Sequence, residues 1–254
     1  MSIPNCYGII PARYDSTRFP GKPLAQISGK PMFWHVFERA KQSKKFAMVV
    51  LATDDARIES VAKDLRVPVV MTRSDHPSGT DRVFEAAELL DIAEDSIVVN
   101  IQGDEPAIEP AMLGEVLSPF TSSEVFVSTL ARKISKKEAK NPNQVKVVFA
   151  ENRQALYFSR SVIPYNRDDS EDALFFGHIG LYAFRMKTLK RFVALKPGRL
   201  EITEKLEQLR LLENSIPIHV VLTEYSAAGV DTPGDIEKVI KIIHRQSCEK
   251  NCGK

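Results

Sequence analysis

The segment GIIPARYDSTRFPGK, from Gly8 to Lys22, decides how the rest of the chain is interpreted. Its apolar start is typical of the end of a buried strand. Arg13, Arg18 and Lys22 then follow within ten residues, and the prolines around them prevent a continuous helix. The segment therefore predicts a first strand that leads into a stiff, cationic loop.

Apolar runs and helical patterns alternate through the first half of the chain. Strands are expected at residues 5–10, 47–52, 67–71 and 96–101, and amphipathic helices at 31–41, 55–65 and 80–91. Nearly continuous apolar strands that alternate with helices indicate an α/β fold with a mostly parallel sheet covered by helices on both faces. Ligands of such sheets bind beyond the carboxyl ends of the strands, where the cationic loop would lie.

The second half has longer strand-like segments. Strands are expected at 125–134, 145–151, 178–185 and 216–224, and helices at 201–214 and 232–245. Repeats, low-complexity tracts and flexible linkers are absent from the sequence. We predict a single domain over residues 1–245, an inserted lobe at about 125–190, and a flexible tail at 246–254.

Composition excludes several classes of protein. The 254 residues include 35 basic and 33 acidic side chains, and a net charge of +2 argues against a general nucleic-acid binder. The sequence has neither a signal peptide nor an apolar run near the ~18 residues of a membrane helix, so we expect a cytoplasmic protein without a membrane partner. Cys6 is expected to be a buried thiol, and Cys248 and Cys252 to be reduced, because His244 alone does not complete a metal site with them.

The cationic loop lacks the two best-known phosphate fingerprints. No G-x-G-x-x-G follows the first strand, and the P-loop pattern fails because Pro23 follows Lys22 and Ser16 replaces the upstream glycine. The loop still offers the guanidinium of Arg13 for two-point contact with phosphate and the ammonium of Lys22 as a compact charge. On composition alone, these cations could equally be solvated surface groups.

Two aspartates are placed to bind a metal ion. Asp104 ends the apolar strand of VVNIQGDEPAIEP (98–110), beside Gly103, and Asp231 precedes the last helix. Mg²⁺ commonly takes one or two carboxylates together with phosphate oxygens. Asp104 could instead be an ordinary turn residue, and Asp231 an ordinary helix cap. Taken together, the cations and carboxylates favour nucleotidyl transfer, which depends on positioning and charge neutralisation.

Nine segments, in order over roughly residues 7–240, resemble those of the 3-deoxy-manno-octulosonate cytidylyltransferase family (CMP-Kdo synthetases): IIPARYDSTRFPGKPL, ATDD, SGTDR, VNIQGDEP, NPNQVKVV, ALYFSRSVIPY, HIGLYAFR, EKLEQLR and GVDTP. The resemblance implies a Rossmann-like nucleotidyltransferase fold, a requirement for Mg²⁺ and a homodimer. It also implies transfer of CMP from CTP to the anomeric hydroxyl of 3-deoxy-D-manno-octulosonate (Kdo), with release of diphosphate, for lipopolysaccharide synthesis.

The resemblance implies a role for each matching residue. The catalytic residues would be Arg13, Lys22 and Asp104, and the metal ligands Asp104 and Asp231. The CTP-binding residues would be Arg13, Ser16, Lys22, Ser78, Gly79, Thr80 and Gln102. The sugar-binding residues would be Arg18, Arg82, Gln102, His178, Tyr182, Glu207 and Gln208. Because no His–Asp or Cys–His pair stands out as a general base, we expect metal coordination to lower the pKa of the attacking hydroxyl.

Structural roles remain open for the sugar-binding candidates. His178 and Tyr182 could be core residues, and Glu207 and Gln208 could form the solvent side of their helix. Arg82 opens a helix, where a cation is unfavourable against the dipole, and this favours a ligand-binding role.

The sequence departs from the family pattern at Gly177, where a basic residue is common, and at PGRLE (197–201), in place of a Ser-Pro-Leu-Glu type segment. The exact sugar therefore stays open. An 8-amino analogue of Kdo would need a carboxylate for its ammonium, which Glu204 or Glu207 could supply. Further alternatives are another nucleotide, a sialic-type acid, or a non-catalytic nucleotide-binding regulator. The dimer surface is expected within 125–190.

Overall fold

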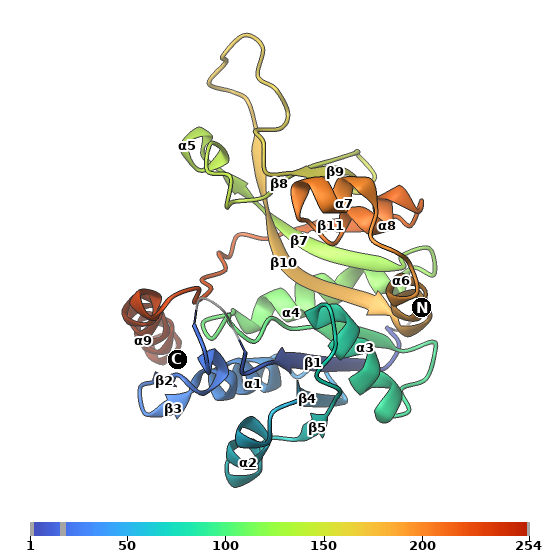
Figure 1. Cartoon of the computed structure of the whole chain (residues 1–254). Helices are drawn as coiled ribbons and strands as arrows, with labels where there is room; N and C mark the ends of the chain where they lie inside the picture. The colour runs from blue at the N-terminus through green and yellow to red at the C-terminus, as the bar shows by residue number, and fades with distance from the viewer. Residues whose placement is uncertain (1–2, 16–18, 253–254) are drawn as a thin grey trace. The chain divides into compact units, whose positions relative to one another are not determined.

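The apolar start of the quoted segment forms β1 (Cys6–Ala12), in which Ile9 and Ile10 are completely buried. The structure, a computed structural model, describes residues 3–15 and 19–252, with side chains to residue 246. It divides into two units (Figure 1). The N-terminal unit comprises Asn5–Ile92, Val99–Leu113 and Ala227–Lys254, and the central unit comprises Met1–Pro4, Ala93–Val98 and Gly114–Ser226. The predicted lobe at 125–190 lies within the central unit.

The N-terminal unit contains the parallel strands predicted from the apolar runs. β1 pairs in parallel with β4 (Met48–Thr53), and β4 pairs in parallel with β5 (Val69–Met71). β6 (Ile97–Asn100) neighbours β1 on the other side, and its second half belongs to this unit. The helices α1 (Met32–Gln42), α2 (Ala56–Asp64) and α3 (Gly79–Leu89) pack against these strands. The predicted fold class, a mostly parallel α/β sheet with helices, is confirmed.

A serine determines where α3 begins. Ser78 has an extended backbone, with φ −140° and ψ 168°, and its side chain accepts hydrogen bonds from the N–H groups of Thr80 and Asp81 at 3.1 and 3.3 Å. These bonds satisfy two of the N–H groups that a helix start leaves without partners. The SGTDR segment therefore places a helix N-terminus directly after the loop that follows β5.

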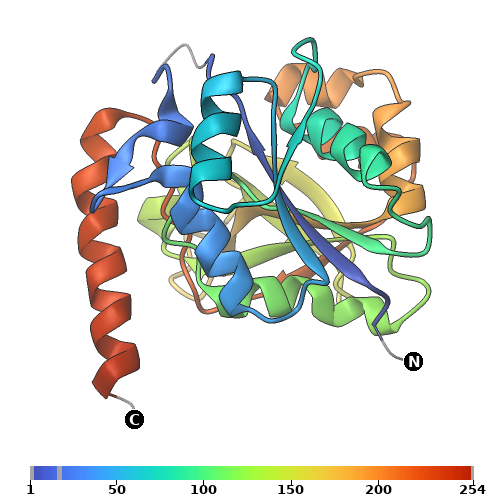
Figure 2. The ribbon, with the colours of Figure 1, turned by 90° about the horizontal axis from the view of Figure 1, so that it is seen from below.

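The C-terminal segment packs against the elements that follow the cationic loop. These are η1 (Lys22–Leu24), β2 (Gln26–Ile27) and β3 (Lys30–Pro31). After η3 (Pro233–Asp235), α9 (Ile236–Cys252) lies alongside the β2–β3 hairpin (Figure 2), and Val239 shares a buried cluster with Ile27 and Ala107. α9 extends beyond residue 245, so the backbone of 246–252, predicted as tail, is helical. The side chains of Cys248 and Cys252 lie outside the described residues.

The central unit is built around β7 (Val127–Ile134). β7 pairs in parallel with β11 (Ile218–Leu222) and antiparallel with β10 (Phe175–Arg185). β8 (Lys146–Phe149) pairs antiparallel with β10 and with β9 (Ala155–Ser159). The remaining elements are η2 (Ser118–Thr121), α5 (Lys136–Ala139), α6 (Met186–Val193), and the second half of α4 (Pro110–Leu117), which divides between the units.

The helix predicted over 201–214 is wrong, because the structure has two shorter helices there. α7 (Arg199–Glu204) ends at Lys205, whose φ of 54° is left-handed, and α8 (Leu209–Glu213) begins after it. The Glu204 carboxylate accepts hydrogen bonds from Ser159 Oγ at 2.6 Å and from the N–H of Arg160 at 2.9 Å. These bonds hold the end of α7 against β9. The chain turns at Lys205 before α8 begins.

No helix in the described chain combines the length and the apolar composition that a membrane crossing requires.

Candidate active site

A hollow of about 260 Å³ in the N-terminal unit collects most of the residues predicted to bind nucleotide. Its lining includes Arg13, Lys22, Ser78, Gly79, Arg82, Gln102 and Asp104. Thr80 and Asp231 do not line it, and Ser16 and Arg18 lie outside the described residues. The cationic loop, the end of β6 and the N-terminus of α3 therefore meet, as the sequence predicts for the carboxyl ends of parallel strands.

Gly103 allows two of these segments to approach each other. A Cβ atom on Gly103 would lie 2.6 Å from the carbonyl oxygen of Pro11, which is closer than van der Waals contact permits. The obstacle is backbone, so it cannot move aside as a flexible side chain would. The absence of a side chain at Gly103 therefore positions Asp104 next to the end of β1.

Lys22 links Asp104 to the segment that precedes Asp231. Its Nζ lies 2.7 Å from Asp104 Oδ2 and donates a hydrogen bond of 2.9 Å to the carbonyl oxygen of Val230. The N–H of Val230 donates to the carbonyl oxygen of Asp104 at 2.9 Å. Three segments that are far apart in the sequence are thus held together by one ammonium and one backbone hydrogen bond.

The loop that contains Asp104 and Glu105, here called the acidic loop, carries less negative charge than its sequence indicates. Burial, together with the charge of Asp104, raises the pKa of the Glu105 carboxyl to about 8. Glu105 is therefore mostly protonated at neutral pH, and Asp104 carries the negative charge next to Lys22.

The oxygen donors of this site are compatible with Mg²⁺. Among the residues that the structure describes, no group of three His, Cys, Asp or Glu side chains is arranged to hold a metal. Asp104 and Asp231 would supply two hard oxygen donors, and phosphate oxygens would complete the coordination, which is the usual arrangement for Mg²⁺. Their metal-binding role stays a prediction.

The hydroxyl groups of the SGTDR segment are already used within the protein. Ser78 Oγ caps α3 and donates to Asp81 Oδ2 at 2.6 Å, and Thr80 Oγ1 accepts from Asn100 Nδ2 at 3.3 Å. A base at this position would therefore meet backbone groups of Ser78 and Gly79 more readily than these hydroxyls.

Arg82 has a protein partner that the sequence does not suggest. Its guanidinium is almost completely buried, 2.8 Å from Asp54 Oδ2 and 2.6 Å from Thr72 Oγ1. This ion pair compensates for the position of Arg82 near the start of α3, so the helix dipole no longer argues for a ligand. The sugar-binding role of Arg82 stays a prediction.

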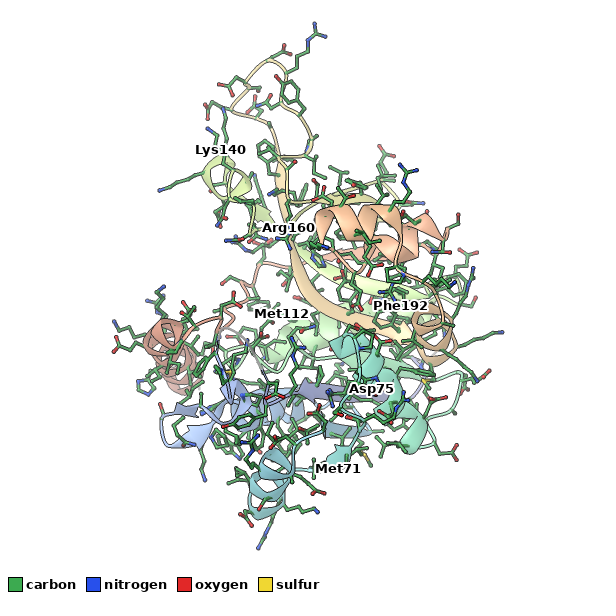
Figure 3. The ribbon with its side chains drawn as sticks, in the orientation of Figure 1. Met71, Asp75, Met112, Lys140, Arg160 and Phe192 are labelled. Carbon is green, nitrogen blue, oxygen red and sulfur yellow. The ribbon has the colours of Figure 1, made fainter. Side chains whose placement is uncertain are left out.

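His178 lies in the central unit, in a row of aromatic rings. The row contains Phe158, His178, Tyr182, Phe184 and Phe192, the last of which is labelled in Figure 3. His178 Nε2 lies 3.0 Å from Thr129 Oγ1, whose hydroxyl donates to a backbone carbonyl. Burial of the ring lowers the pKa of His178 to about 3, although part of the residue reaches the surface. His178 can therefore hydrogen-bond to a sugar as a neutral imidazole, and it supplies no positive charge.

Tyr182, Glu207 and Gln208 also belong to the central unit. Within the described chain, Gln208 Nε2 is buried without a hydrogen bond, whereas the Thr129 hydroxyl is a hydrogen-bond partner for Tyr182 Oη. Burial and the charge of Glu207 raise the pKa of Tyr182 well above its usual value. Gln208 is only 8% exposed, so its placement on the solvent side of a helix is wrong.

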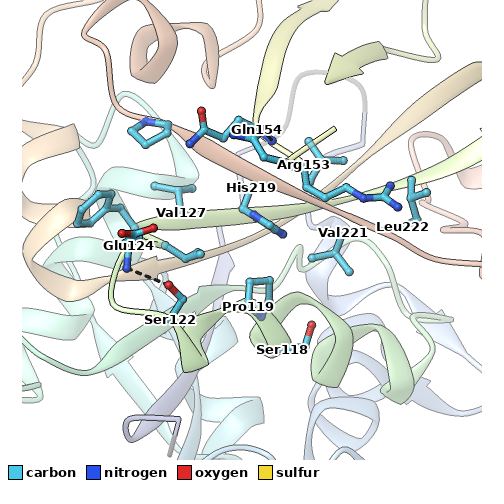
Figure 4. A pocket seen from close by; sticks show the side chains of 15 residues that line it. Ser118, Pro119, Ser122, Glu124, Val127, Arg153, Gln154, His219, Val221 and Leu222 are labelled. Atoms are coloured by element: carbon cyan, nitrogen blue, oxygen red, sulfur yellow. Dashed lines mark hydrogen bonds between the residues drawn. The ribbon is translucent and has the colours of Figure 1, made fainter. Parts of the chain in front are cut away.

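A larger hollow in the central unit, about 570 Å³, contains none of the predicted residues (Figure 4). Arg153 and Gln154 lie along one side, with His219 and Leu222 of β11 and Pro119 of η2. Burial and the nearby Arg153 lower the pKa of His219. The smaller hollow contains most of the predicted residues, so it is the candidate nucleotide site.

Comparisons with known proteins identify the family of this chain. The cytidylyltransferase family model matches residues 7–218. The 3-deoxy-manno-octulosonate cytidylyltransferase of Oleidesulfovibrio alaskensis is 62% identical, over 96% of this chain and 98% of that protein. The corresponding protein of Nitratidesulfovibrio vulgaris is 59% identical, over 96% of this chain and 98% of that protein.

The chain belongs to the 3-deoxy-manno-octulosonate cytidylyltransferase family. A solved structure of CMP:2-keto-3-deoxy-manno-octonic acid synthetase, complexed with CTP, superimposes with a TM-score of 0.90 at 42% identity, and the match covers 95% of this chain and 99% of that one. The resemblance seen in the nine sequence segments is therefore confirmed.

The two departures from the family pattern have local structural reasons. A Cβ on Gly177 would lie 2.8 Å from both Gln144 Nε2 and Ile134 Cγ2, so a basic side chain has no space here unless these groups move. Gly198 precedes α7, and a Cβ there would overlap the carboxylate of Glu213. Both positions are filled by neighbouring protein groups.

Sequence reasoning missed His76, which lines the nucleotide hollow. Its Nε2 contacts Glu85 Oε2, and Glu85 also accepts from the N–H of Arg73 at 2.9 Å. The position of His76 two residues before the capping Ser78 was the available signal. Its pairing with a residue of α3 could not be recognised without the fold.

We predict that Gly103→Ala weakens CTP binding at least tenfold and lowers the free energy of unfolding by about 1–3 kcal/mol. The added methyl must push Asp104 away from Pro11. Calorimetric titration with CTP and urea unfolding measure the two effects. Gly180→Ala, where the methyl would meet nothing within 4 Å, is the control. Unchanged CTP affinity in Gly103→Ala would show that the close contact between Gly103 and Pro11 does not position the site.

We predict that the imidazole of His178 stays neutral as the pH falls from about 8 to about 5. Its folded pKa of about 3 is below the ordinary 6.5, so below pH 6.5 the unfolded chain takes up a proton that the folded chain does not. Stability should therefore fall by up to about 1.4 kcal/mol per pH unit from this group. Histidine ring NMR follows the titration, and a His178 midpoint near its ordinary value would contradict the prediction.

Proposed function

We propose that this chain transfers CMP from CTP to the anomeric hydroxyl of Kdo and releases diphosphate. The observation that carries the proposal is the meeting of Arg13, Lys22 and Asp104 in one hollow, in a chain of this family. Such a reaction needs a site that concentrates positive charge around a triphosphate and holds the attacking hydroxyl in line with the α-phosphate.

The N-terminal unit would bind CTP. Arg13 makes no ion pair within the described residues, and its guanidinium lines the hollow, where it would contact phosphate oxygens. The N–H groups of Ser78 and Gly79 would face the nucleotide, because those of Thr80 and Asp81 already bond to Ser78 Oγ. Gln102, next to Gly103, lines the same hollow.

Asp104 and Asp231 would hold Mg²⁺, with Asp104 released from Lys22. When bound, the ion would neutralise phosphate charge and lower the pKa of a coordinated hydroxyl. The protein itself would position the triphosphate through Arg13 and Lys22.

The central unit would bind the sugar acid. One of its polar atoms, Gln208 Nε2, is buried without a hydrogen bond in the described chain, which is costly unless a ligand supplies an acceptor. A polyhydroxylated sugar offers both donors and acceptors. His178, neutral and with Nε2 directed at Thr129, would present its other ring nitrogen as an acceptor.

The 8-amino analogue of Kdo is the alternative substrate. Glu204, one of the two carboxylates considered for its ammonium, is bonded to Ser159 and Arg160 and holds the end of α7. Glu207 is therefore the carboxylate that would meet the ammonium, and it lies 4.0 Å from Arg210. Arg210 makes its short contacts with Glu201, at 2.6 and 2.8 Å, so it does not neutralise Glu207, and the preference for Kdo follows from the named relatives.

The deciding experiment measures diphosphate release from each nucleoside triphosphate with Mg²⁺. We expect release from CTP only when Kdo is added, slower release with the 8-amino analogue, and none with a sialic-type acid. Asp104→Asn should lower turnover at least about a hundredfold, whereas Asp64→Asn, an exposed residue at the end of α2, should leave it unchanged. Binding of CTP without diphosphate release under any condition would favour the nucleotide-binding regulator instead.

We also propose a cytoplasmic homodimer that uses the central unit. Several exposed apolar side chains fall within 125–190: Phe126, Leu156, Val162, Tyr165 and Leu174, with Tyr165 85% exposed. Large exposed apolar groups of this kind mark contact surfaces. Sedimentation equilibrium should give twice the chain mass, and Tyr165→Glu combined with Leu174→Glu should shift the mass toward a monomer. A wild-type monomer at micromolar concentration would refute the dimer.

A further inference from the structure

The ammonium of Lys22 occupies the place beside Asp104 that the proposed function gives to a metal ion. Nζ lies 2.7 Å from Asp104 Oδ2, and the Lys22 side chain is only 16% exposed. Nζ also bonds to the carbonyl oxygen of Val230, the residue before Asp231. The positive charge therefore sits where the two segments that carry the metal ligands meet.

We propose that Lys22 is the counter-ion of Asp104 in the nucleotide-free protein, and that it leaves Asp104 only when a triphosphate and a divalent cation arrive together. Lys22 would then exchange the carboxylate for phosphate oxygens. This inference rests on the proposed function, because it assumes that Asp104 is a metal ligand. Its consequence is that the nucleotide-free protein binds divalent cations weakly.

The exchange follows from charge. A lysine ammonium and a divalent cation on the same carboxylate repel each other strongly at separations of a few ångströms, and partial burial reduces the screening by water. A carboxylate has lone pairs for more than one partner, so the geometry alone would permit both cations. Repulsion makes joint occupancy unfavourable until an anion is added.

A triphosphate supplies that anion. The backbone of Lys22 is fixed, because its N–H donates to Phe19 O at 3.1 Å and its carbonyl accepts from Ala25 N–H at 3.0 Å. The four-carbon stem can still rotate, and an ammonium accepts oxygen partners without a strict geometry. Phosphates in the hollow would bind Nζ at the same time as the incoming metal ion takes the carboxylate of Asp104. Nucleotide and metal should therefore increase each other's affinity by the same factor.

The test measures binding of Mn²⁺, as a substitute for Mg²⁺, to the nucleotide-free full chain by electron paramagnetic resonance. We expect Lys22→Met and Lys22→Gln to bind Mn²⁺ at least tenfold more tightly than the wild type. Two neutral replacements of different polarity guard against one that fails to fold, and circular dichroism verifies folding. Lys30→Met removes a lysine of the same unit that has no contact with Asp104, and should change the affinity less than twofold.

The gain in Mn²⁺ affinity must disappear when Asp104→Asn is added to Lys22→Met. If the lysine variants bind Mn²⁺ no more tightly than the wild type, or if the gain survives Asp104→Asn, the inference is overturned. The metal site itself is tested separately with CTP present, where the wild type should retain protein-bound Mn²⁺ and Asp104→Asn should not. Failure of that second measurement would refute the metal ligands of the proposed function, and with them the inference.

Discussion

Lys22 supplies a cation to the partly exposed carboxylate of Asp104, in the loop that follows β6. The two residues are 82 positions apart, and Lys22 reaches Val230, 208 positions away, at the same time. One ammonium contacts both the carboxylate of Asp104 and the carbonyl of Val230. The cationic loop, the loop after β6 and the segment before α9 are therefore held together. This contact joins residues of the hollow to the segment before α9 in the nucleotide-free protein.

The surrounding features adapt the site to an anionic ligand. Protonation of Glu105, through its raised pKa, limits the negative charge that a triphosphate would meet. The Asp54–Arg82 ion pair holds α3 in position, and Ser78 caps its start, so the helix N-terminus faces the hollow. The absence of a side chain at Gly103 then lets the acidic loop lie against Pro11.

Much of the fold could be predicted because its signals are local. The apolar runs of β1, β4 and β6 are continuous, and Ser78 precedes α3 with a capping residue's chemistry. The break at Lys205 could not be predicted, because it accompanies bonds from Ser159 and Arg160, about 45 positions away, to Glu204. The structural partner of Arg82 and the pairing of His76 with Glu85 were missed for the same reason. Residue types indicated which groups carry the chemistry, and only the fold showed which of them already have partners.

The most direct measurement is a crystal structure of the protein with CTP and Mn²⁺, in which anomalous scattering locates the metal. We expect Mn²⁺ bound to carboxylate oxygens of Asp104 and Asp231, with Lys22 Nζ on a phosphate oxygen and no longer in contact with Asp104. A metal bound elsewhere, or a Lys22 that keeps its ion pair with Asp104 in the loaded site, would contradict this expectation.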